Sequence, residues 1–353
     1  MGAQMPLTLH VDGDRWRASL RMTADRYGAE LVPVAKGNGY GFGIAGLARR
    51  CQWLGVGCVA VGTYAEAPAV LSRFGGDVLV LEPWRDFLPG VRSGEARDPR
   101  LVHTVGRLDD LAALGAHPGT RVLVEARTSM GRHGMSRHDL SDAAGLVRGG
   151  RLRLEGLALH LPLVGDREPE AEHWSAVLEA SHLDTRRLWV SHLSADQVDR
   201  LRRARPALTV APRVGTGLWL GDRGALRAGA TVLDAHQVAQ GDRVGYRQRA
   251  MTRSGTVLVV SGGTSHGIGL EAPTAVTGLR RRAVALARGG LDAAGIALSP
   301  FRVGGRQRWF VEPPHMQVSL LFLPAGVPAP PVGAAVDVDV RFTTTTFDAV
   351  DLP

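Results

Sequence analysis

Between Leu31 and Gly221 the sequence alternates short apolar runs with segments of helical spacing, and this alternation restricts the fold more than any other feature. Short apolar runs bounded by turn-forming residues are typical of buried strands. Eight strand–helix units in succession predict a closed (β/α)8 TIM-like barrel. The predicted strands are Leu31–Ala35, Val59–Gly62, Val78–Leu81, Leu101–Thr104, Val122–Glu125, Leu157–His160, Leu188–Ser191 and Leu208–Ala211. The segments of helical spacing between them include Ile44–Leu54, Tyr64–Phe74, Leu108–Leu114, Leu140–Arg148, Glu170–Ala180 and Ala195–Arg205.

After about residue 230 the pattern changes to strands separated by turns rich in glycine and proline. This pattern predicts a mostly-β domain over residues 231–353 that follows a barrel domain over residues 12–230, and residues 6–11 form an early strand that could join the β domain. Only Ala272–Ala287 has competing helical character. The predicted strands of this half are Val232–Val238, Gly241–Tyr246, Gly255–Val260, Trp309–Glu312, Met316–Leu323 and Ala335–Phe342.

Composition and charge exclude several classes of protein. A hydrophobic content of 44% and a charged content of 22% are ordinary for a soluble globular protein. The net charge of +8 raises the question of a nucleic-acid partner, but the arginines are scattered. Their densest groups, Arg202–Arg205 and Arg280–Arg282, lie in helix-like segments without interleaved aromatic residues, so we expect solvated faces and no nucleic-acid binding.

The cysteines and the N-terminus indicate the compartment. With only Cys51 and Cys58, a disulfide framework or a cysteine-based metal site is excluded, and we expect two free thiols and no bound metal. The first residues have neither a basic start nor an apolar core, and no run approaches the ~20 apolar residues of a membrane span. We therefore expect a cytoplasmic protein that does not bind a membrane.

Lys36, at the end of the first predicted strand, is the only lysine among 42 basic residues; the other 41 are arginines. Arginine supplies positive charge and ion pairs, but its guanidinium stays protonated. A lysine amine can lose its proton and attack a carbonyl to form an imine. The sequence thus suggests a lysine that forms a Schiff base; the alternative is a chance survivor in an arginine-biased sequence.

Further polar residues follow other strands of the predicted barrel, in particular Arg132, His160, His192 and Arg213. Catalytic groups of such barrels lie at the carboxyl ends of the strands. Each residue alone has a structural explanation, as a hydrogen-bonded histidine or a surface arginine. Because their strands end at one rim, we expect these side chains to converge with Lys36.

Five stretches carry a resemblance to a known family. They are Val34–Gly43 (VAKGNGYGFG), Thr128–Met135 (TSMGRHGM), Gly156–His160 (GLALH), Arg213–Gly221 (RVGTGLWLG) and Gly241–Tyr246 (GDRVGY). In residue type and order the chain resembles the alanine racemases, pyridoxal-phosphate enzymes with an N-terminal barrel and a C-terminal β domain. The resemblance covers about residues 7–340.

The resemblance implies a two-base amino-acid racemase, with alanine as the leading substrate. Lys36 would hold pyridoxal 5'-phosphate as an imine and act as one base, and Tyr246 would be the base on the opposite face. Inverting a stereocentre requires proton transfer on both faces of the substrate, which agrees with this pair. The family also implies a homodimer in which each active site is shared between two subunits.

The remaining site residues are likewise those that the resemblance implies. Arg213 would face the pyridine nitrogen, while Arg132 would bind the substrate carboxylate with Glu125 holding its guanidinium. Met316 would line the substrate site. The other cofactor-binding residues implied are Tyr40, His160, Ser194, Gly215 and Thr216.

The chain departs from the family near the substrate entrance. Gly262–Gly269 replaces a stretch that carries a tyrosine in the family, the acid that follows the methionine at Met316 is absent, and the family's C-terminal segment is not found before Pro353. These changes leave two alternatives to alanine racemization. One is a racemase or epimerase for another or larger amino acid, and the other is an inactive homologue that binds the cofactor or only a protein partner.

Overall fold

The computed structural model describes residues 7–92, 98–270 and 297–353. The chain divides into two compact units, a barrel unit of residues 17–221 and a β unit formed by residues 1–16 together with 222–353. The boundary between the two units lies at residues 221 and 222. Residue 230, the expected boundary, lies inside the continuous strand β10 (Leu226–Val238). Within the described residues, no helix is both long enough and apolar enough to cross a membrane.

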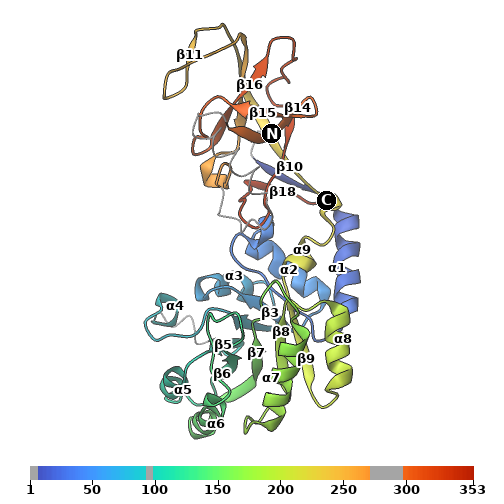
Figure 1. Ribbon diagram of the computed structural model, residues 1–353, viewed down its shortest axis with the longest axis vertical. Coiled ribbons are helices and arrows are strands. Elements are labelled where there is room, and N and C mark those ends of the chain that lie inside the picture. Colours follow the sequence, from blue (N-terminus) through green and yellow to red (C-terminus); the bar gives the residue numbers. More distant parts are fainter. Residues whose placement is uncertain (1–6, 93–97, 271–296) are drawn as a thin grey trace. The chain divides into compact units, whose positions relative to one another are not determined.

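The barrel unit has eight parallel strands in the order β2-β9-β8-β7-β6-β5-β4-β3 (Figure 1). The sheet closes between its first and last strands, where Val34 bridges Ala60 and the Ala35 amide donates to the Ala60 carbonyl at 2.8 Å. The predicted (β/α)8 barrel is confirmed. Its strands are β2 (Val32–Pro33), β3 (Cys58–Val61), β4 (Asp77–Val80), β5 (Leu101–Val105), β6 (Arg121–Ala126), β7 (Arg153–Leu159), β8 (Arg187–Ser191) and β9 (Thr209–Val214).

Helices alternate with these strands along the chain, as the sequence predicted. The barrel interior is filled by small and branched side chains, including Val32, Ala60, Leu123 and Ala211, so the barrel is a packed core and not a pore. The helices are α1 (Gly13–Tyr27), α2 (Ile44–Leu54), α3 (Ala67–Leu71), α4 (Pro89–Arg92), α5 (Leu108–Leu114), α6 (Asp139–Gly149), α7 (Glu168–Ala180), α8 (Ala195–Ala204) and α9 (Thr216–Trp219).

The β unit is built around β10, which pairs with β17 at one end and with β13 at the other. These pairings close the order β13-β16-β15-β14-β17-β10 into a ring, and β1 and β18 extend the sheet beyond β10. Phe301, Leu258 and Leu321 lie in its core with no exposed surface. Its strands are β1 (Thr8–Val11), β10, β11 (Arg243–Val244), β12 (Arg249–Ala250), β13 (Gly255–Ser261), β14 (Leu298–Val303), β15 (Arg306–Phe310), β16 (Val318–Pro324), β17 (Ala335–Val338) and β18 (Ala349–Asp351).

Several predicted strands of the β half need correction. The predicted strand Gly241–Tyr246 is only β11, because Gly245 adopts a φ of 79° and turns the chain toward β12, so that Tyr246 lies in a hairpin turn. The predicted strand Met316–Leu323 begins at Val318, and Met316 lies in the preceding loop. The predicted strand Ala335–Phe342 ends at Val338, and the predicted strand Trp309–Glu312 is Arg306–Phe310. Strands β12, β14 and β18 were not predicted. The possible helix Ala272–Ala287 lies outside the described residues.

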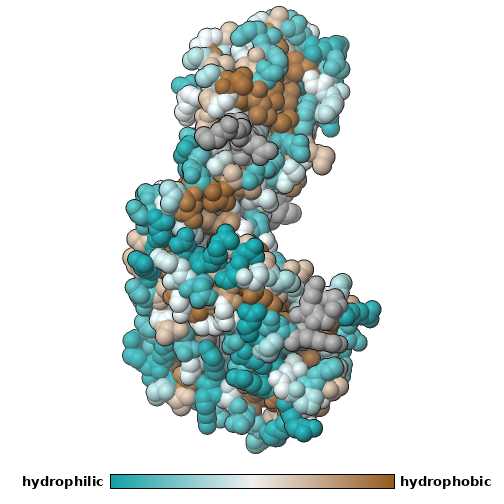
Figure 2. Space-filling view, turned by 180° about the vertical axis from the view of Figure 1, so that it is seen from behind, coloured by the Kyte–Doolittle hydropathy of each residue, from teal (hydrophilic) through white to brown (hydrophobic). Residues whose placement is uncertain are grey.

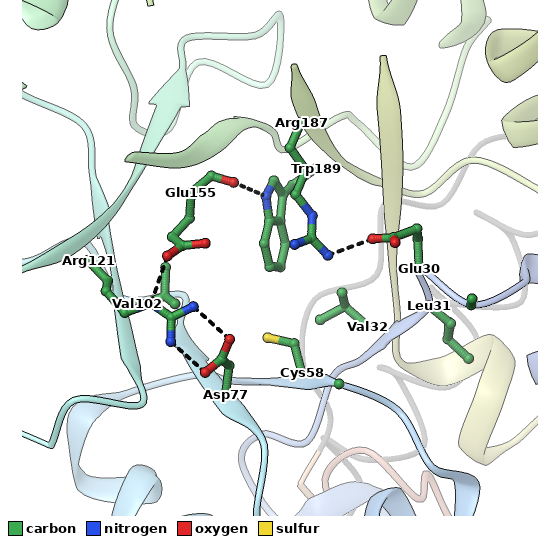
Figure 3. Close-up of a pocket in the computed structure, with 12 residues that line it drawn as sticks. Glu30, Leu31, Val32, Cys58, Asp77, Val102, Arg121, Glu155, Arg187 and Trp189 are labelled. Carbon is green, nitrogen blue, oxygen red and sulfur yellow. Dashed lines mark hydrogen bonds and ion pairs between the residues drawn. The ribbon is translucent and has the colours of Figure 1, made fainter. Parts of the chain in front are cut away.

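A cavity of about 190 Å³ lies at the amino-terminal end of the barrel strands, and a network of ion pairs lines it (Figure 3). Arg121 binds Asp77 at 2.6 Å and Glu155 at 2.7 Å. Arg187 binds Glu30 at 2.6 Å. This end of a barrel contributes stability, whereas chemistry belongs at the opposite end.

Candidate active site

The loop after β2 presents Lys36 at the carboxyl end of the barrel. Tyr40 is buried there with φ 56° and ψ 27°, a left-handed conformation that few non-glycine residues adopt. The Asn38 carboxamide supports this turn by accepting the Tyr40 amide at 3.1 Å. The loop thus leaves Lys36 partly exposed and directs Tyr40 inward.

Glu66 ties this loop to the next one, and the sequence analysis missed it. Its Oε1 accepts the Gly37 amide at 2.7 Å, and its Oε2 accepts the amides of Gly62 at 2.6 Å and Thr63 at 3.1 Å. The spacing of Thr63 and Glu66 is that of a helix capping box, a signal present in the sequence. Glu66 therefore connects Gly37, the residue after Lys36, to the backbone of the loop after β3.

The surroundings of Lys36 favour its neutral amine. Burial lowers the pKa of Lys36, and the positive charges of Arg132 and Arg213 lower it further, whereas Glu66 opposes the shift. A lower pKa leaves more free amine near neutral pH, and the free amine is the form that attacks a carbonyl.

Arg213, on β9, is buried with an unsatisfied donor. Its Nη2 donates to the Leu159 carbonyl at 2.8 Å, but its buried Nε has no hydrogen-bond partner. Burial lowers the pKa of Arg213 to about 10, with Glu125 opposing the shift and Arg132 adding to it. A buried N–H without an acceptor costs free energy unless a ligand supplies one.

Two histidines follow the neighbouring strands β7 and β8. The rings of His160 and His192 meet edge to face with centroids 5.2 Å apart. Burial, followed by the charge of Arg213, lowers the pKa of His160 to about 3, and burial also lowers that of His192. Both imidazoles are therefore neutral near pH 7, and the buried His192 Nδ1 has no hydrogen-bond partner.

The turn from β9 into α9 passes directly over Tyr40. A Cβ at Gly215 would collide with the Tyr40 hydroxyl, so only glycine permits this approach. Gly215 precedes α9 and Thr216 begins it, where backbone amides lack intrahelical acceptors. Ser194 caps α8, where its Oγ accepts the Gln197 amide at 3.3 Å, and its predicted contact with the cofactor stays a prediction.

Glu125 lies on β6, and Arg132 lies in the loop after it. Glu125 is 4% exposed, and its buried Oε2 has no hydrogen-bond partner. Burial raises the pKa of Glu125, although the charges of Arg213 and Arg132 oppose the shift. Among the described residues, Glu125 makes no ion pair with Arg132 within 4.0 Å, and the predicted support of the Arg132 guanidinium by Glu125 stays a prediction.

Two hydrogen bonds anchor the loop that carries the exposed Arg132. The Thr128 hydroxyl donates to the His160 carbonyl at 2.6 Å, and the Ser129 amide donates to Glu170 on α7 at 2.6 Å. The loop is therefore connected to the end of the next strand and to the helix that follows it.

Tyr246 and Met316 belong to the β unit, where their side chains are 85% and 73% exposed. The Tyr246 amide donates to Glu312 Oε1 at 3.0 Å. The centroids of the Tyr246 and His315 rings lie 4.5 Å apart. The loop that replaces the family's tyrosine stretch contacts Met316, because the Ser265 hydroxyl donates to the Met316 carbonyl at 2.6 Å.

The barrel unit thus brings together three positive groups, Lys36, Arg132 and Arg213, and two carboxylates, Glu66 and Glu125. The charges of Arg132 and Arg213 lower the pKa of Lys36, and the charge of Arg132 lowers the pKa of Arg213, as expected of positive groups that lie near one another. An anionic ligand that has a carbonyl for the amine and an acceptor for the Arg213 Nε would satisfy this set.

The chain's similarity to known proteins agrees with this site. A sequence model of the family described as "Alanine racemase, N-terminal domain" matches residues 11–221. A curated alanine racemase from a Nitratiruptor species is 28% identical over 152 residues. That match spans 42% of this chain and 42% of the relative, so it covers less than half the length of either.

Solved structures share the fold. The alanine racemase from E. faecalis is 20% identical with a TM-score of 0.67, covering 96% of this chain and 89% of that one. The enzyme from Bacillus anthracis with bound L-Ala-P is 18% identical with a TM-score of 0.69, covering 97% and 87%. The enzyme from Bartonella henselae, solved with covalently bound pyridoxal phosphate, is 15% identical with a TM-score of 0.68, covering 96% and 91%.

Proposed function

The chain belongs to the alanine racemase family, and from this premise we propose that it is a pyridoxal-phosphate-dependent amino-acid racemase with alanine as its leading substrate. The observation that carries the proposal is the pairing of the chain's single lysine, whose pKa is lowered, with the buried Arg213, whose Nε has no acceptor. The Lys36 amine can condense with the cofactor's aldehyde, and the Arg213 Nε–H can donate a hydrogen bond to the cofactor's ring nitrogen.

The residues present fit this cofactor. Lys36 would bind its aldehyde carbon, and Arg213 Nε would donate to its ring nitrogen. The phosphate would be held by the Tyr40 hydroxyl and by the backbone amides of Gly215 and Thr216, where a side chain at Gly215 is excluded. The neutral His160 and the capping Ser194 complete the proposed set. When bound, the cofactor supplies an electron sink that acidifies the substrate's α-proton.

The protein's own part in the reaction is to place the substrate and to move protons. Arg132 would hold the substrate carboxylate, with the loop bonds of Thr128 and Ser129 keeping it in place. The Lys36 amine would exchange the α-proton on one face of the substrate, and the Tyr246 phenol would exchange it on the other. Met316 would line the site beside Tyr246, and Glu125 would supply negative charge near Arg132 and Arg213.

We also propose a homodimer in which each site takes Lys36 from one subunit and Tyr246 from its partner. Tyr246 is 85% exposed, which suits a residue that is covered by another subunit. Figure 2 shows hydrophobic surface on the β unit, which suits the same role. A symmetric dimer would form two equivalent sites.

The first test is a visible absorbance spectrum of the purified protein with and without added pyridoxal phosphate. We expect a yellow band that borohydride abolishes in the unmodified protein. Lys36→Arg keeps the positive charge but cannot condense with the aldehyde, so we expect no borohydride-sensitive band. A colourless protein that stays colourless with added cofactor would refute the proposed function.

The second test is racemization of L-alanine by Tyr246→Phe, which removes only the hydroxyl. We expect the visible band to be kept and kcat to fall by at least about a thousandfold, because one face of the substrate loses its base. Tyr27→Phe is the matched control, since it removes a hydroxyl that donates to the Leu193 carbonyl at 3.0 Å. Full activity in Tyr246→Phe would contradict the two-base mechanism.

A second substrate class is favoured by the loop of residues 262–269. This loop folds as a short 3-10 turn with His266 inward, bound to Asp348 at 3.1 Å, and it contains no tyrosine. A site without that tyrosine suits a larger amino acid. Failure with alanine, together with exchange of solvent deuterium into the α-position of another amino acid, would support this alternative.

A further inference from the structure

A buried carboxylate lies directly behind Tyr246. Glu312, in the segment between β15 and β16, is 4% exposed and accepts three hydrogen bonds. The amides of Tyr246 and Arg247 donate to it at 3.0 and 3.3 Å, and the His315 Nε2 lies 2.6 Å from its Oε1. One carboxylate therefore connects the Tyr246 turn to His315.

The turn is shaped to accept this carboxylate. A Cβ at Gly245 would collide with the Glu312 carboxyl group, and the φ of 79° at Gly245 also favours glycine. The hairpin itself is short, with β11 and β12 paired only through Arg243–Ala250 and Val244–Arg249. The Gln248 amide closes the turn by donating to the Gly245 carbonyl at 3.1 Å, and Glu312 adds hydrogen bonds to the Tyr246 and Arg247 amides inside that turn.

Glu312 is an acceptor at neutral pH. Burial alone would raise the pKa of its carboxyl group, but the hydrogen bonds from His315, Tyr246 and Arg247 outweigh burial and lower the pKa. An ionised carboxylate only accepts, so the His315 Nε2 must carry a proton. This bond fixes the orientation of the imidazole, whose ring centroid lies 4.5 Å from that of the phenol with a 41° angle between the planes.

The loop 262–269 supports His315 from the other side. The Thr264 amide donates to the His315 carbonyl at 2.8 Å, and the Ser265 amide donates to the Met316 carbonyl at 2.9 Å. Glu312 therefore holds the side chain of His315, and this loop holds its backbone. The fixed imidazole ring can restrict the orientation of the Tyr246 phenol.

We propose that Glu312 and His315 are positioning residues for Tyr246, with Glu312 fixing its backbone and His315 fixing the orientation of its phenol. This inference rests on the proposed role of Tyr246 as a base. Misplacing a reacting group by about 1 Å can cost about a hundredfold in rate. We expect kcat to fall about ten- to a hundredfold in Glu312→Gln, with the KM for alanine and the visible band changed less than about twofold.

The variants at His315 separate its two contacts. His315→Phe keeps a ring beside Tyr246 but cannot donate to Glu312, and His315→Asn keeps a donor but has no ring. We expect both to lower kcat. The control is His236→Asn, because His236 also pairs with a carboxylate of this unit, Asp234 at 3.2 Å, but is exposed.

Isotope effects on both enantiomers distinguish positioning from a loss of folded protein. With α-deuterated L- and D-alanine, slower proton transfer at Tyr246 should raise the kcat/KM isotope effect for the enantiomer whose proton Tyr246 removes and lower it for the other. A purely structural role would reduce the active fraction and leave both isotope effects at their unmodified values. That result, in active Glu312→Gln protein, would overturn the inference.

Nuclear magnetic resonance of cofactor-free protein with labelled tyrosine gives a readout that does not depend on activity. The chain has four tyrosines, so the Tyr246 signal is identified by its loss in Tyr246→Phe. We expect this signal to shift in Glu312→Gln and in both His315 variants, and not in His236→Asn. An unshifted signal in Glu312→Gln would also overturn the inference, whereas lack of racemization by the unmodified protein would count against the proposed function alone.

Discussion

At the scale of single residues, the site depends on how charge around Lys36 is balanced. Arg132 and Arg213 disfavour its ammonium form, and Glu66 favours it. Partial burial is the largest of the effects that lower the pKa of Lys36, and the charges of the two arginines add to it. The same two arginines are those proposed to bind ligand, so the groups that hold the ligand also keep the amine reactive.

This balance predicts the pH dependence of condensation between Lys36 and pyridoxal phosphate. We expect the rate of band formation in cofactor-free protein to rise with a midpoint below 10.5, the ordinary pKa of lysine. Arg132→Leu removes a positive charge and should move the midpoint up, whereas Glu66→Gln should move it down. Stopped-flow absorbance measures both, with Arg137→Leu as a control at an exposed arginine. A midpoint that moves down in Arg132→Leu would contradict this account.

Residues that act through their own chemistry could be predicted from sequence, and residues that act on the backbone could not. Lys36 is unusual by composition, and Arg213 and His160 lie at strand ends. Glu66 and Glu312 instead accept backbone amides from loops remote in sequence. The capping-box spacing marks Glu66 as a helix-start residue, but its bond to Gly37 and the bonds of Glu312 to Tyr246 and Arg247 depend on where distant loops meet.

At the scale of elements, the two ends of the barrel strands have different roles. The carboxyl ends hold polar atoms without partners, such as the Arg213 Nε and the Glu125 Oε2. The amino ends hold mainly ion pairs, in which Arg121 bridges Asp77 and Glu155, although the buried Nε of Arg187 has no partner there (Figure 3). Ion pairs of this kind contribute to stability.

We therefore expect Arg121→Met to lower the free energy of unfolding of the cofactor-free protein by about 2–4 kcal/mol, because two carboxylates lose their shared partner. The matched control is Arg153→Met, since Arg153 also binds Glu155, at 3.1 Å, but its side chain is 68% exposed. An exposed pair contributes at most about 1 kcal/mol. Urea denaturation measures both variants, and equal losses would contradict the distinction between buried and exposed pairs.

The strands of the barrel could be predicted because each is a buried apolar run between helices of clear spacing. The strands of the β unit were harder to predict, because pairing with neighbouring strands and the position of turns determine where these short strands begin and end. β14 mixes exposed and buried positions in an irregular register against β15, and Tyr246 leaves its predicted strand because Gly245 turns the chain.

At the scale of the whole molecule, the proposed catalytic groups are divided between the two units. Lys36 and the cofactor-binding groups belong to residues 17–221, and Tyr246 with its supporting pair belongs to residues 222–353. In the proposed dimer, one complete site needs a barrel unit from one subunit and a β unit from the other. The proposed mechanism therefore needs a barrel unit and a β unit to meet at each site, and in the proposed homodimer they come from different subunits.

Mixing two inactive variants tests this arrangement. Lys36→Arg and Tyr246→Phe homodimers should each lack activity, but a mixed dimer places both changes in one site and leaves the other site intact. After complete subunit exchange, we expect about a quarter of the unmodified activity, because half of the dimers are mixed and each has one intact site. Sites completed within one subunit would give no recovery on mixing.

The path of the chain through the β unit also affects its synthesis. β1 pairs with β10 and β18, yet the entire barrel lies between β1 and those partners in sequence. At roughly 5–20 residues per second, the ribosome needs on the order of 10–40 seconds to produce the barrel after β1 has emerged. During that interval β1 is an unpaired strand on a nascent chain. The barrel can fold as soon as its last strand emerges, so β1, the first strand synthesised, is among the last to pair with its neighbours.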